Sequence, residues 1–326
     1  YLRDCTAAVT RRPCCRTVRD IDLDHTEGAG GVLKVGKEEL MQLARIKDAT
    51  GNAVAAVWME GNVIALPVSQ DHAFADLGTV MSAGDKALTH ARQYAERQIA
   101  TGKSVQASRV QFLSPTTPMV FLGLGYNYKA LAENEGLPLN KHPELFAKLP
   151  GCAVGHDHPI LVPKVIDKID YEAELAVVIG RTARRVKAKN ALDYVGGYTA
   201  CNDLTAKVIP RPVESGSIIV PLKASDTFGP MGPTLIPARG VDPQNLTLLC
   251  RVNGEEKQRF STSDMVHSVA ETIEYITARI TLNPGDVITT GTSLGIGIIK
   301  KPPVFLKEGD VVEVQIEGYP ALRNKI

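Results

Sequence analysis

The chain has 326 residues, of which 44% are hydrophobic and 22% are charged, so it can bury a sizeable core and is expected to be a soluble, folded protein. Its 37 basic and 36 acidic side chains nearly cancel and are interspersed, which argues against nucleic acid or an anionic membrane as a partner. No apolar stretch approaches the roughly 20 residues of a membrane-spanning helix, so the expected partner is a small molecule.

Residues 1–40 are a poorly defined N-terminal extension. They lack the hydrophobic core of a secretory signal, and the acids Asp4, Asp20, Asp22 and Asp24 are atypical of a transit peptide. The six cysteines of the whole chain follow neither a disulfide framework nor a CxxC metal pattern, which favours a reducing compartment. We therefore expect a cytoplasmic protein, with a mitochondrial location as the alternative.

Residues 41–115 predict a small β-rich domain. The stretch "LARIKDATGNAVAAVWMEGNVIALP" contains short β-prone runs separated by turn clusters at residues 50–52 and 60–62. Residues 84–102 predict a helix that lies between two glycines. The segment "SPTTP" at residues 114–118 then breaks the pattern, and we place the domain boundary there.

Residues 116–326 predict a second domain that is mainly β with some helix. Apolar runs of strand length recur between turn residues, namely "MVFLGLG", "AELAVVIG", "GGYTACND", "GPTLIP", "LTLLCRVNGE", "DVITTGT" and "DVVEVQIEG". One helix is predicted to begin at Ser263 or Asp264, because apolar residues follow at spacings of three and four. These residues are Val266, Val269, Ile273, Ile276 and Ile280. The pattern favours a β-roll or sandwich over alternating βαβ units, with the apolar stripe of the helix packed on a sheet.

The segment "DYEAELAVVIG" places two carboxylates, Glu172 and Glu174, beside an apolar run. Residues two apart in a strand project from the same face, so both carboxyl groups can reach one ion. On spacing alone, a solvated strand face is the commoner reason for such a pair. Asp203 ends another strand-like run, "GGYTACND", and three oxygen ligands on neighbouring strands would suit a hard divalent cation. The pattern indicates a site for Mg²⁺ or Mn²⁺, which in a crystal could hold Ca²⁺.

Several segments resemble, in order over residues 121–326, the catalytic domain of the fumarylacetoacetate hydrolase (FAH) superfamily. They are "DYEAELAVVIG", "GYTACND", "KASDTFGPMGP", "VNGEEKQ", "LNPGDVITTGTSLGIG" and "KPPVFLKEGDVVEVQIEG". The chain is most similar to small homodimeric members that include acylpyruvate hydrolases, oxaloacetate decarboxylases and oxaloacetate tautomerases. Residues 41–115 are similar to their short N-terminal domain. The resemblance implies an FAH-type catalytic β-roll, a homodimer, and metal ligation by Glu172, Glu174 and Asp203.

The resemblance also implies a substrate and roles for further residues. A member of this family is expected to act on a 2-oxo or 1,3-dicarbonyl carboxylate through a metal-stabilised enolate. Lys223 would donate to the developing oxyanion, or act as a base if its pKa fell. Thr292 would help to hold a substrate carboxylate, and Tyr128, Lys207 and Asp226 are the other expected substrate contacts.

The chain departs from the family at the lid motif "NYxxHxxE", which here is "NYKALAEN". Leu131 takes the place of the histidine and Asn134 the place of the glutamate. Leucine cannot transfer a proton, so the dyad that activates water is absent unless Glu133 or Glu135 substitutes for it.

A second departure follows Asp203, where the family pattern "SARDxQ" has become "TAKVIP". Lys207 keeps the charge of the arginine but loses its bidentate fork, and Pro210 removes a side-chain amide. The changed groups handle water and substrate, while the metal ligands are kept. We therefore expect a tautomerase, isomerase or lyase. The alternatives are a C–C bond hydrolase or decarboxylase, and a non-catalytic metal-binding scaffold or ligand sensor.

Two weaker motifs do not change this prediction. "GTSLG" matches the nucleophile elbow of α/β-hydrolases and would make Ser293 a nucleophile, but the last histidine, His267, precedes it and no helix pattern follows. "GHDHP" offers His156 and His158 at strand-like spacing. A turn with solvated histidines is favoured there, because no third nitrogen or sulfur ligand is near in sequence.

Overall fold

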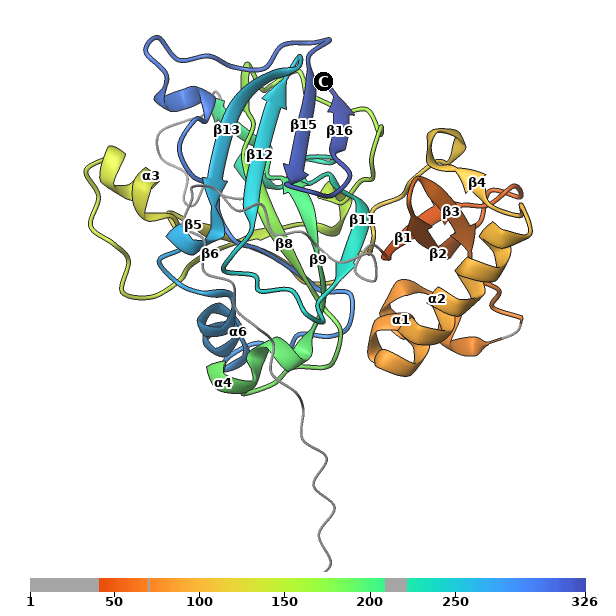
Figure 1. The fold of residues 1–326 in the computed structure, drawn as a ribbon. Helices are drawn as coiled ribbons and strands as arrows, with labels where there is room; N and C mark the ends of the chain where they lie inside the picture. Colours follow the sequence, from red (N-terminus) through yellow and green to blue (C-terminus); the bar gives the residue numbers. More distant parts are fainter. Residues whose placement is uncertain (1–40, 70, 209–221) are drawn as a thin grey trace, which may run out of the picture.

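The computed structural model describes residues 41–69, 71–208 and 222–326 (Figure 1). The expectations for the N-terminal extension and for Pro210 fall outside these residues. Within the described chain, no helix is both long enough and apolar enough to cross a lipid bilayer.

Short antiparallel strands open the described chain, as the turn clusters of the sequence predict. They are β1 (Gln42–Lys47), β2 (Ala53–Met59), β3 (Asn62–Ala65) and β4 (Val105–Gln106). Gly51 and Gly61 have φ angles of 88° and 80° in the two turns, a conformation that glycine reaches without a Cβ clash. α1 (Leu77–Ser82) and the predicted helix α2 (Asp85–Ala100) pack against these strands in a shared apolar core.

β1 joins the N-terminal strands to the rest of the molecule, because Leu43 pairs with Leu235 of β11. The resulting sheet runs in the order β4-β3-β2-β1-β11-β9-β8-β14-β5-β6. β14 and β5 run parallel, and the other described pairs in this sheet are antiparallel. The strands beyond β1 are β5 (Phe121–Gly125), β6 (Glu144–Lys148), β8 (Ala173–Ile179), β9 (Val195–Asn202), β11 (Met231–Pro237) and β14 (Val287–Thr289). One sheet therefore extends across the proposed domain boundary, and the division into two domains stays a prediction.

A second sheet packs on one face of β8 and β9 (Figure 1). It runs in the order β13-β12-β15-β16. Its strands are β12 (Thr247–Val252), β13 (Glu255–Ser261), β15 (Val311–Ile316) and β16 (Leu322–Lys325). A short ladder of β7 (Lys168–Asp170) and β10 (Thr205–Val208) adjoins the start of β8. Two packed sheets with few helices confirm the predicted mainly β fold class.

β8 is buried on both faces, which explains its unbroken apolar run. Leu175 and Val177 belong to the core shared with the second sheet, whereas Ala176 and Val178 belong to the core shared with the N-terminal strands. Because side chains alternate along a strand, Glu174 lies on the same face as Ala176 and Val178. The carboxylate therefore stands at the end of a buried face.

The helix predicted near residues 263–264 begins later, and α6 spans Val269–Thr277. The predicted start was wrong because Ser268 and Glu271 form a capping box. The Glu271 carboxylate accepts a hydrogen bond from Ser268 N at 2.9 Å, and the Ser268 hydroxyl accepts one from Glu271 N at 3.2 Å. These reciprocal bonds satisfy backbone groups that only a helix start leaves free.

α4 (Ala188–Ala191) lies beside α6 below the ends of β8 and β9 (Figure 1). Glu274 of α6 accepts hydrogen bonds from Ala188 N at 2.8 Å and from Lys187 Nζ at 3.0 Å. The apolar stripe of α6 joins the main core, since Val269, Ile273 and Ile276 all belong to it.

Replacing Ile273 by Ala should lower the free energy of unfolding by about 3 kcal/mol, because the side chain is 0% exposed and its removal leaves a cavity in the core. Ile280→Ala is the matched control from the same predicted stripe. Its side chain is 39% exposed, and we expect a loss below about 1 kcal/mol. Urea unfolding of both variants measures the difference, and equal losses would contradict the assignment of the buried face.

Candidate metal centre

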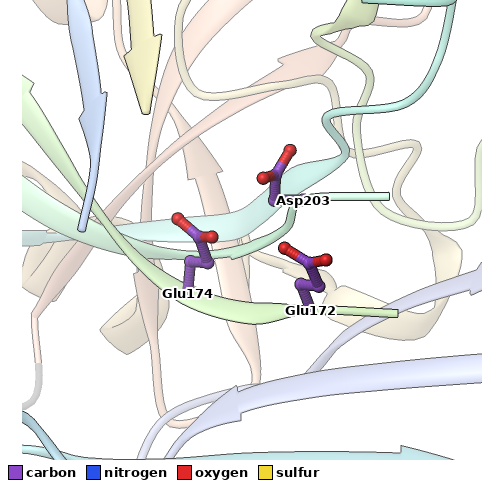
Figure 2. A group of neighbouring side chains, drawn as sticks. All are labelled: Glu172, Glu174 and Asp203. Carbon is purple, nitrogen blue, oxygen red and sulfur yellow. The ribbon is translucent and has the colours of Figure 1, made fainter. Parts of the chain in front are cut away.

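Three carboxylates meet where β8 begins and β9 ends (Figure 2). One oxygen from each of Glu172, Glu174 and Asp203 lies within 4.8 Å of the other two. The three residues are only 6%, 1% and 0% exposed. β8 and β9 pair antiparallel with Glu174 opposite Cys201, which sets Asp203 beside Glu172 on the same face. The strands are therefore neighbours, as convergence of these three residues requires.

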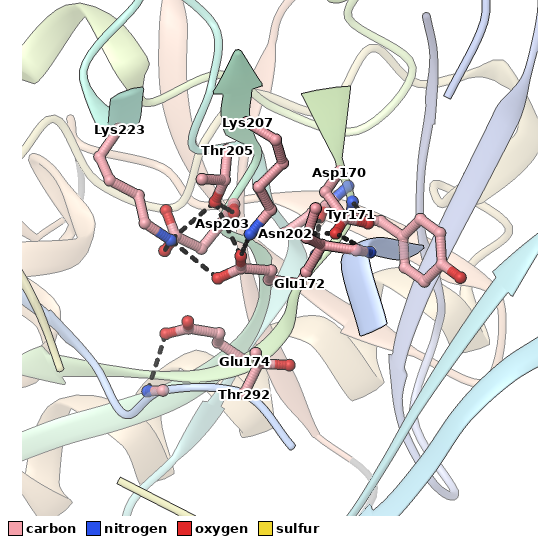
Figure 3. A network of polar contacts seen from close by, with 12 residues as sticks. Asp170, Tyr171, Glu172, Glu174, Asn202, Asp203, Thr205, Lys207, Lys223 and Thr292 are labelled. Carbon is pink, nitrogen blue, oxygen red and sulfur yellow. Dashed lines mark hydrogen bonds and ion pairs between the residues drawn. The ribbon is translucent and has the colours of Figure 1, made fainter. Parts of the chain in front are cut away.

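Hydrogen bonds to the backbone hold the chain around these carboxylates (Figure 3). Asp203 N donates to Glu172 O at 2.8 Å, and Glu172 N donates to the side-chain oxygen of Asn202 at 3.0 Å. Ala173 N donates at 3.0 Å to Oε1 of Gln258, a residue of β13 in the second sheet. Both sheets therefore fix the positions of the acidic side chains.

Lys207 of β10 and Lys223 reach into the acidic cluster (Figure 3). Lys223 Nζ donates at 2.7 Å to both Glu172 Oε2 and Thr205 Oγ1, and it also contacts Asp203 Oδ2. Lys207 Nζ donates to Glu172 Oε1 at 2.7 Å. Burial alone would raise the pKa of Glu172, but the charges of Lys207 and Lys223 outweigh burial and lower this pKa to about 2. Glu172 is therefore ionised.

Lys148, at the end of β6, is a third lysine of the site and was not singled out from the sequence. Its Nζ lies 2.5 Å from both Asp203 Oδ1 and the Lys223 carbonyl oxygen. The side chains of Lys148 and Asp203 are both 0% exposed. Lys148 therefore links a predicted metal ligand to the backbone that carries Lys223. A lysine that ends a strand is usually solvated, so its sequence position contains no signal for this role.

Glu174 is the carboxylate that forms no described ion pair, although the charge of Lys223 acts on it from farther away and would by itself lower its pKa. It accepts a hydrogen bond from Gly291 N at 2.9 Å, and no described lysine or arginine forms an ion pair with it. Burial and then the nearby charge of Asp203 raise the pKa of Glu174 well above its usual range. A buried carboxylate beside two others calls for a compensating charge, and an oxygen-only donor set suits Mg²⁺ or Mn²⁺. The residues present therefore fit the metal that the sequence indicated.

A cavity of about 300 Å³ opens beside the carboxylates, and Glu172 and Glu174 border it. Asp170 fixes one wall, because its carboxylate accepts hydrogen bonds from Gly297 N at 2.7 Å and Ile298 N at 2.8 Å. A concave, mostly apolar cavity with a few converging polar groups is typical of a small-molecule site. The apolar side chains that line it are Leu124, Tyr126, Leu131, Leu145, Phe146, Leu222, Ile296, Ile298 and Ile299.

Several residues singled out from the sequence border this cavity, namely Thr292, Lys207, Lys223 and Glu135. Thr292 Oγ1 accepts a hydrogen bond from Gln258 Nε2 at 2.9 Å. The Gln258 side-chain amide therefore accepts a hydrogen bond from Ala173 N through its oxygen, and it orients the Thr292 hydroxyl by donating one through its nitrogen.

Other predicted residues lie away from the described cavity wall. Glu133 is on the exposed face of α3 (Lys129–Asn134). Tyr128 is 0% exposed, and its hydroxyl has no hydrogen-bond partner among the described residues. Asp226 is exposed beside Gly151. The roles assigned to Glu133, Tyr128 and Asp226 stay predictions.

The lid helix α3 is anchored at its start. Ala130 N donates to Asp264 Oδ2 at 3.0 Å, and Asn127 Nδ2 donates to the carbonyl oxygens of His267 and Thr290 at 3.1 and 3.0 Å. Leu131 then faces the cavity and is only 6% exposed. The lid wall is therefore apolar at the position where the family motif has histidine.

The two weaker motifs gain no support from the structure. Ser293 is buried, and the next helical segment among the described residues is the 3₁₀ turn Gly297–Ile299. His156 lies in a turn, where its Nδ1 accepts a hydrogen bond from Arg323 N at 3.1 Å. Among the described residues, neither His156 nor His158 belongs to a group of metal-ligating side chains.

Replacing Lys148 by Met should lower the free energy of unfolding by about 2 kcal/mol, because it removes one of the two ammonium groups that contact the buried Asp203 carboxylate and leaves only Lys223 in contact with it. Lys187→Met is the matched control. Its surface partner is Glu274, the two side chains are 73% and 36% exposed, and such pairs contribute below about 1 kcal/mol. Urea unfolding without divalent ions measures both losses. A small, equal loss in the two variants would contradict the role of Lys148.

Comparisons with known proteins place this geometry in a family. The family model described as fumarylacetoacetate (FAA) hydrolase C-terminal matches residues 120–326. The mitochondrial oxaloacetate tautomerase FAHD2A of Bos taurus is 39% identical over 221 residues, which cover 67% of this chain and 70% of that protein.

Solved structures agree with the sequence comparisons. The fumarylacetoacetate hydrolase of psychrophilic Exiguobacterium antarcticum matches with a TM-score of 0.71 and 30% identity, over 88% of this chain and 99% of that chain. The 2-hydroxyhepta-2,4-diene-1,7-dioate isomerase of Mycobacterium marinum matches with a TM-score of 0.66 and 31% identity, over 87% of this chain and 97% of that chain. With its two packed sheets and its cluster of buried carboxylates, the chain belongs to the fumarylacetoacetate hydrolase family.

Proposed function

We propose that the chain is a divalent-metal-dependent enzyme that enolises a 2-oxo or 1,3-dicarbonyl carboxylate and releases a tautomer or isomer. The observation that carries the proposal is Glu174, a buried carboxylate without a described ion pair at one end of an apolar cavity. The bovine relative is named a tautomerase and the Mycobacterium marinum protein an isomerase. Both names support an isomerisation outcome over hydrolysis.

Glu172, Glu174 and Asp203 are the residues that would hold the cation, since their oxygens converge within 4.8 Å. When bound, the cation supplies Lewis-acid stabilisation of the negative charge that collects on the keto oxygen during enolisation. Charge stabilisation in a site that excludes water is commonly the largest contribution to such a reaction. We infer that Mg²⁺ or Mn²⁺ is the physiological ion.

Lys207, Lys223 and Thr292 are assigned to the substrate carboxylate and keto oxygen. Both side chains border the cavity, and Lys207, which donates one described hydrogen bond to Glu172, can donate into it. Lys223 already donates to Glu172, Asp203 and Thr205, so it would exchange one of these contacts for a substrate oxygen. The Thr292 hydroxyl oxygen already accepts a hydrogen bond from Gln258, so its own proton is free to be donated to a substrate oxygen. These donors all act on oxygens that gain negative charge as enolisation proceeds.

Glu135 borders the cavity from the C-terminal end of α3 and is exposed at its mouth, so the proton at the carbon next to the keto group is not assigned to it. Leu131, on the same lid, offers an apolar surface that cannot activate water. Without the histidine–glutamate dyad of the family motif, the cavity favours reprotonation of the enolate over cleavage by water.

Assembly and location extend the proposal. We infer a homodimer, because Leu161, Val162 and Val165 are 58%, 38% and 66% exposed within one short segment. Exposed apolar residues that gather in this way often mark contacts between proteins. A cytoplasmic or mitochondrial location stays a prediction.

Replacing Glu174 by Gln should reduce catalysed enolisation at least about 100-fold, because an amide cannot supply the charge that a divalent ion requires from this ligand. Deuterium exchange next to the keto group of oxaloacetate and of an acylpyruvate, followed by NMR with Mg²⁺, measures the rate above the uncatalysed background. Glu308→Gln, which changes an exposed carboxylate away from the cavity, is the control. Undiminished exchange by the Glu174 variant, or by the unaltered protein in excess chelator, would refute metal-dependent enolisation.

Installing the family's lid residues, with Leu131→His and Asn134→Glu together, should add C–C cleavage of an acylpyruvate to an enzyme that otherwise isomerises it. The reason is that imidazole and carboxylate can activate water, whereas leucine cannot. NMR detection of the released acyl acid and pyruvate measures cleavage in both proteins. If the unaltered protein already cleaves the substrate as fast as it exchanges the proton, the hydrolase alternative replaces the isomerase proposal.

A further inference from the structure

β6 presents a row of three unlike side chains that runs along the cavity. Glu144, Phe146 and Lys148 are two residues apart, so they project from the same face of the strand. Lys148 is buried against Asp203, Phe146 is partly exposed, and Glu144 is exposed. The row therefore passes from the buried carboxylate cluster to the mouth of the cavity.

Glycines on the neighbouring strand β5 make room for this row. Phe146 pairs with Gly123 and Glu144 pairs with Gly125 across the two strands. A Cβ atom on Gly123 would lie 2.2 Å from Cζ of Phe146, and one on Gly125 would lie 3.5 Å from Cδ of Glu144. Both side chains of β6 therefore lie over β5. A larger residue at Gly123 would displace Phe146, whereas a Cβ atom at Gly125 would make an ordinary contact with Glu144.

The two ends of the row have opposite charge character. The Phe146 ring centre is 4.9 Å from Lys223 Nζ, so the aromatic ring borders this ammonium group at the inner end of the cavity. At the mouth, the carboxylates of Glu135 and Glu144 each accept one amide hydrogen bond, from Asn134 at 3.3 Å and from Asn140 at 3.2 Å.

Neither mouth carboxylate has an ion-pair partner among the described residues. The cations that line the described cavity, Lys207 and Lys223, both contact Glu172 at the inner end. The mouth is therefore acidic, and the middle of the cavity is apolar.

We propose that Glu144, together with Glu135, selects the substrate by the charge at the far end of its chain. The substrate class is a 2-oxo acid with an apolar chain several atoms long that ends in a neutral or cationic group, rather than in a second carboxylate. The inference rests on the proposed function, because it assumes that the 2-oxo acid group binds at the carboxylate cluster.

Chain length decides which substrates are affected by this selection. A strand rises about 3.3 Å per residue, so Glu144 stands about 13 Å along β6 from Lys148. A four-carbon dicarboxylate bound by its 2-oxo acid group is too short to reach the mouth, so Glu144 does not change its affinity. A longer chain with a terminal carboxylate meets like charge there, and at a partly exposed site the repulsion reduces binding by about fivefold for each facing carboxylate.

Inert analogues test this without turnover. Three N-substituted oxamates share the chelating acid group and differ only at the end of a five-atom chain, which is a methyl, a carboxylate or an ammonium group. Calorimetry with saturating Mg²⁺ measures their affinities for the unaltered protein. We expect the methyl and ammonium forms to bind at least about fivefold more tightly than the carboxylate form.

Glu144→Gln should reduce the preference for the methyl form over the carboxylate form by about fivefold, and adding Glu135→Gln should bring the affinities of all three forms within about twofold of one another. Both residues are exposed, so these near-isosteric changes leave the core untouched. Glu308→Gln, which changes a carboxylate outside the cavity, should keep the full preference.

Equal affinities in the unaltered protein, or a preference that Glu144→Gln leaves unchanged, would overturn the inference. Unsubstituted oxamate separates this failure from that of the proposed function. If oxamate binds with Mg²⁺ and Glu174→Gln abolishes the binding, the metal centre stands and the chain-end ratios alone decide the role of Glu144. If oxamate does not bind at all, both proposals are wrong.

Discussion

The antiparallel pairing of β8 with β9 is the constraint on which the rest of the site depends. Its register brings Glu172, Glu174 and Asp203 onto one face, where their oxygens converge within 4.8 Å and solvent is excluded. Three buried like charges cannot persist without compensation, because burial disfavours each charge and the others repel it. The surrounding lysines supply part of this compensating charge, and a divalent cation fits the part that remains.

The charges of the three carboxylates are not compensated equally, and this difference points to the function of the site. Lys148 and Lys223 contact Asp203, while Lys207 and Lys223 contact Glu172, so two of the carboxylates form ion pairs with lysines. Glu174 receives only a backbone hydrogen bond from Gly291 among the described contacts. A network built for stability alone would pair every buried charge, since a single unpaired one is costly. In the proposed function, this carboxylate without an ion pair is the group whose charge a divalent cation would compensate.

The distribution of charged and apolar groups along the cavity bears on the substrate as well as on the ion. Its inner end contains the charged groups, its walls are apolar, and its mouth has Glu135 and Glu144. Leu131 keeps the lid wall apolar at the position where the family motif has a proton-transferring histidine. In the proposed function, the carboxylates and the lid affect different steps: the carboxylates would hold the cation that favours formation of an enol, and the lid would determine whether water takes part afterwards.

The strands, the mainly β class and the three carboxylates that could hold a metal were predictable from the sequence, because alternation along a strand and oxygen-donor chemistry are local properties. The tertiary structure decided which distant groups meet those carboxylates. Lys148 and Glu144 are ordinary strand residues until the pairing of β6 with β5 sets one against Asp203 and the other at the cavity mouth. Glu135 borders the cavity and Glu133 does not, because the end of α3 turns only one of them inward. These contacts join segments that lie far apart in the chain, so no local sequence pattern encodes them.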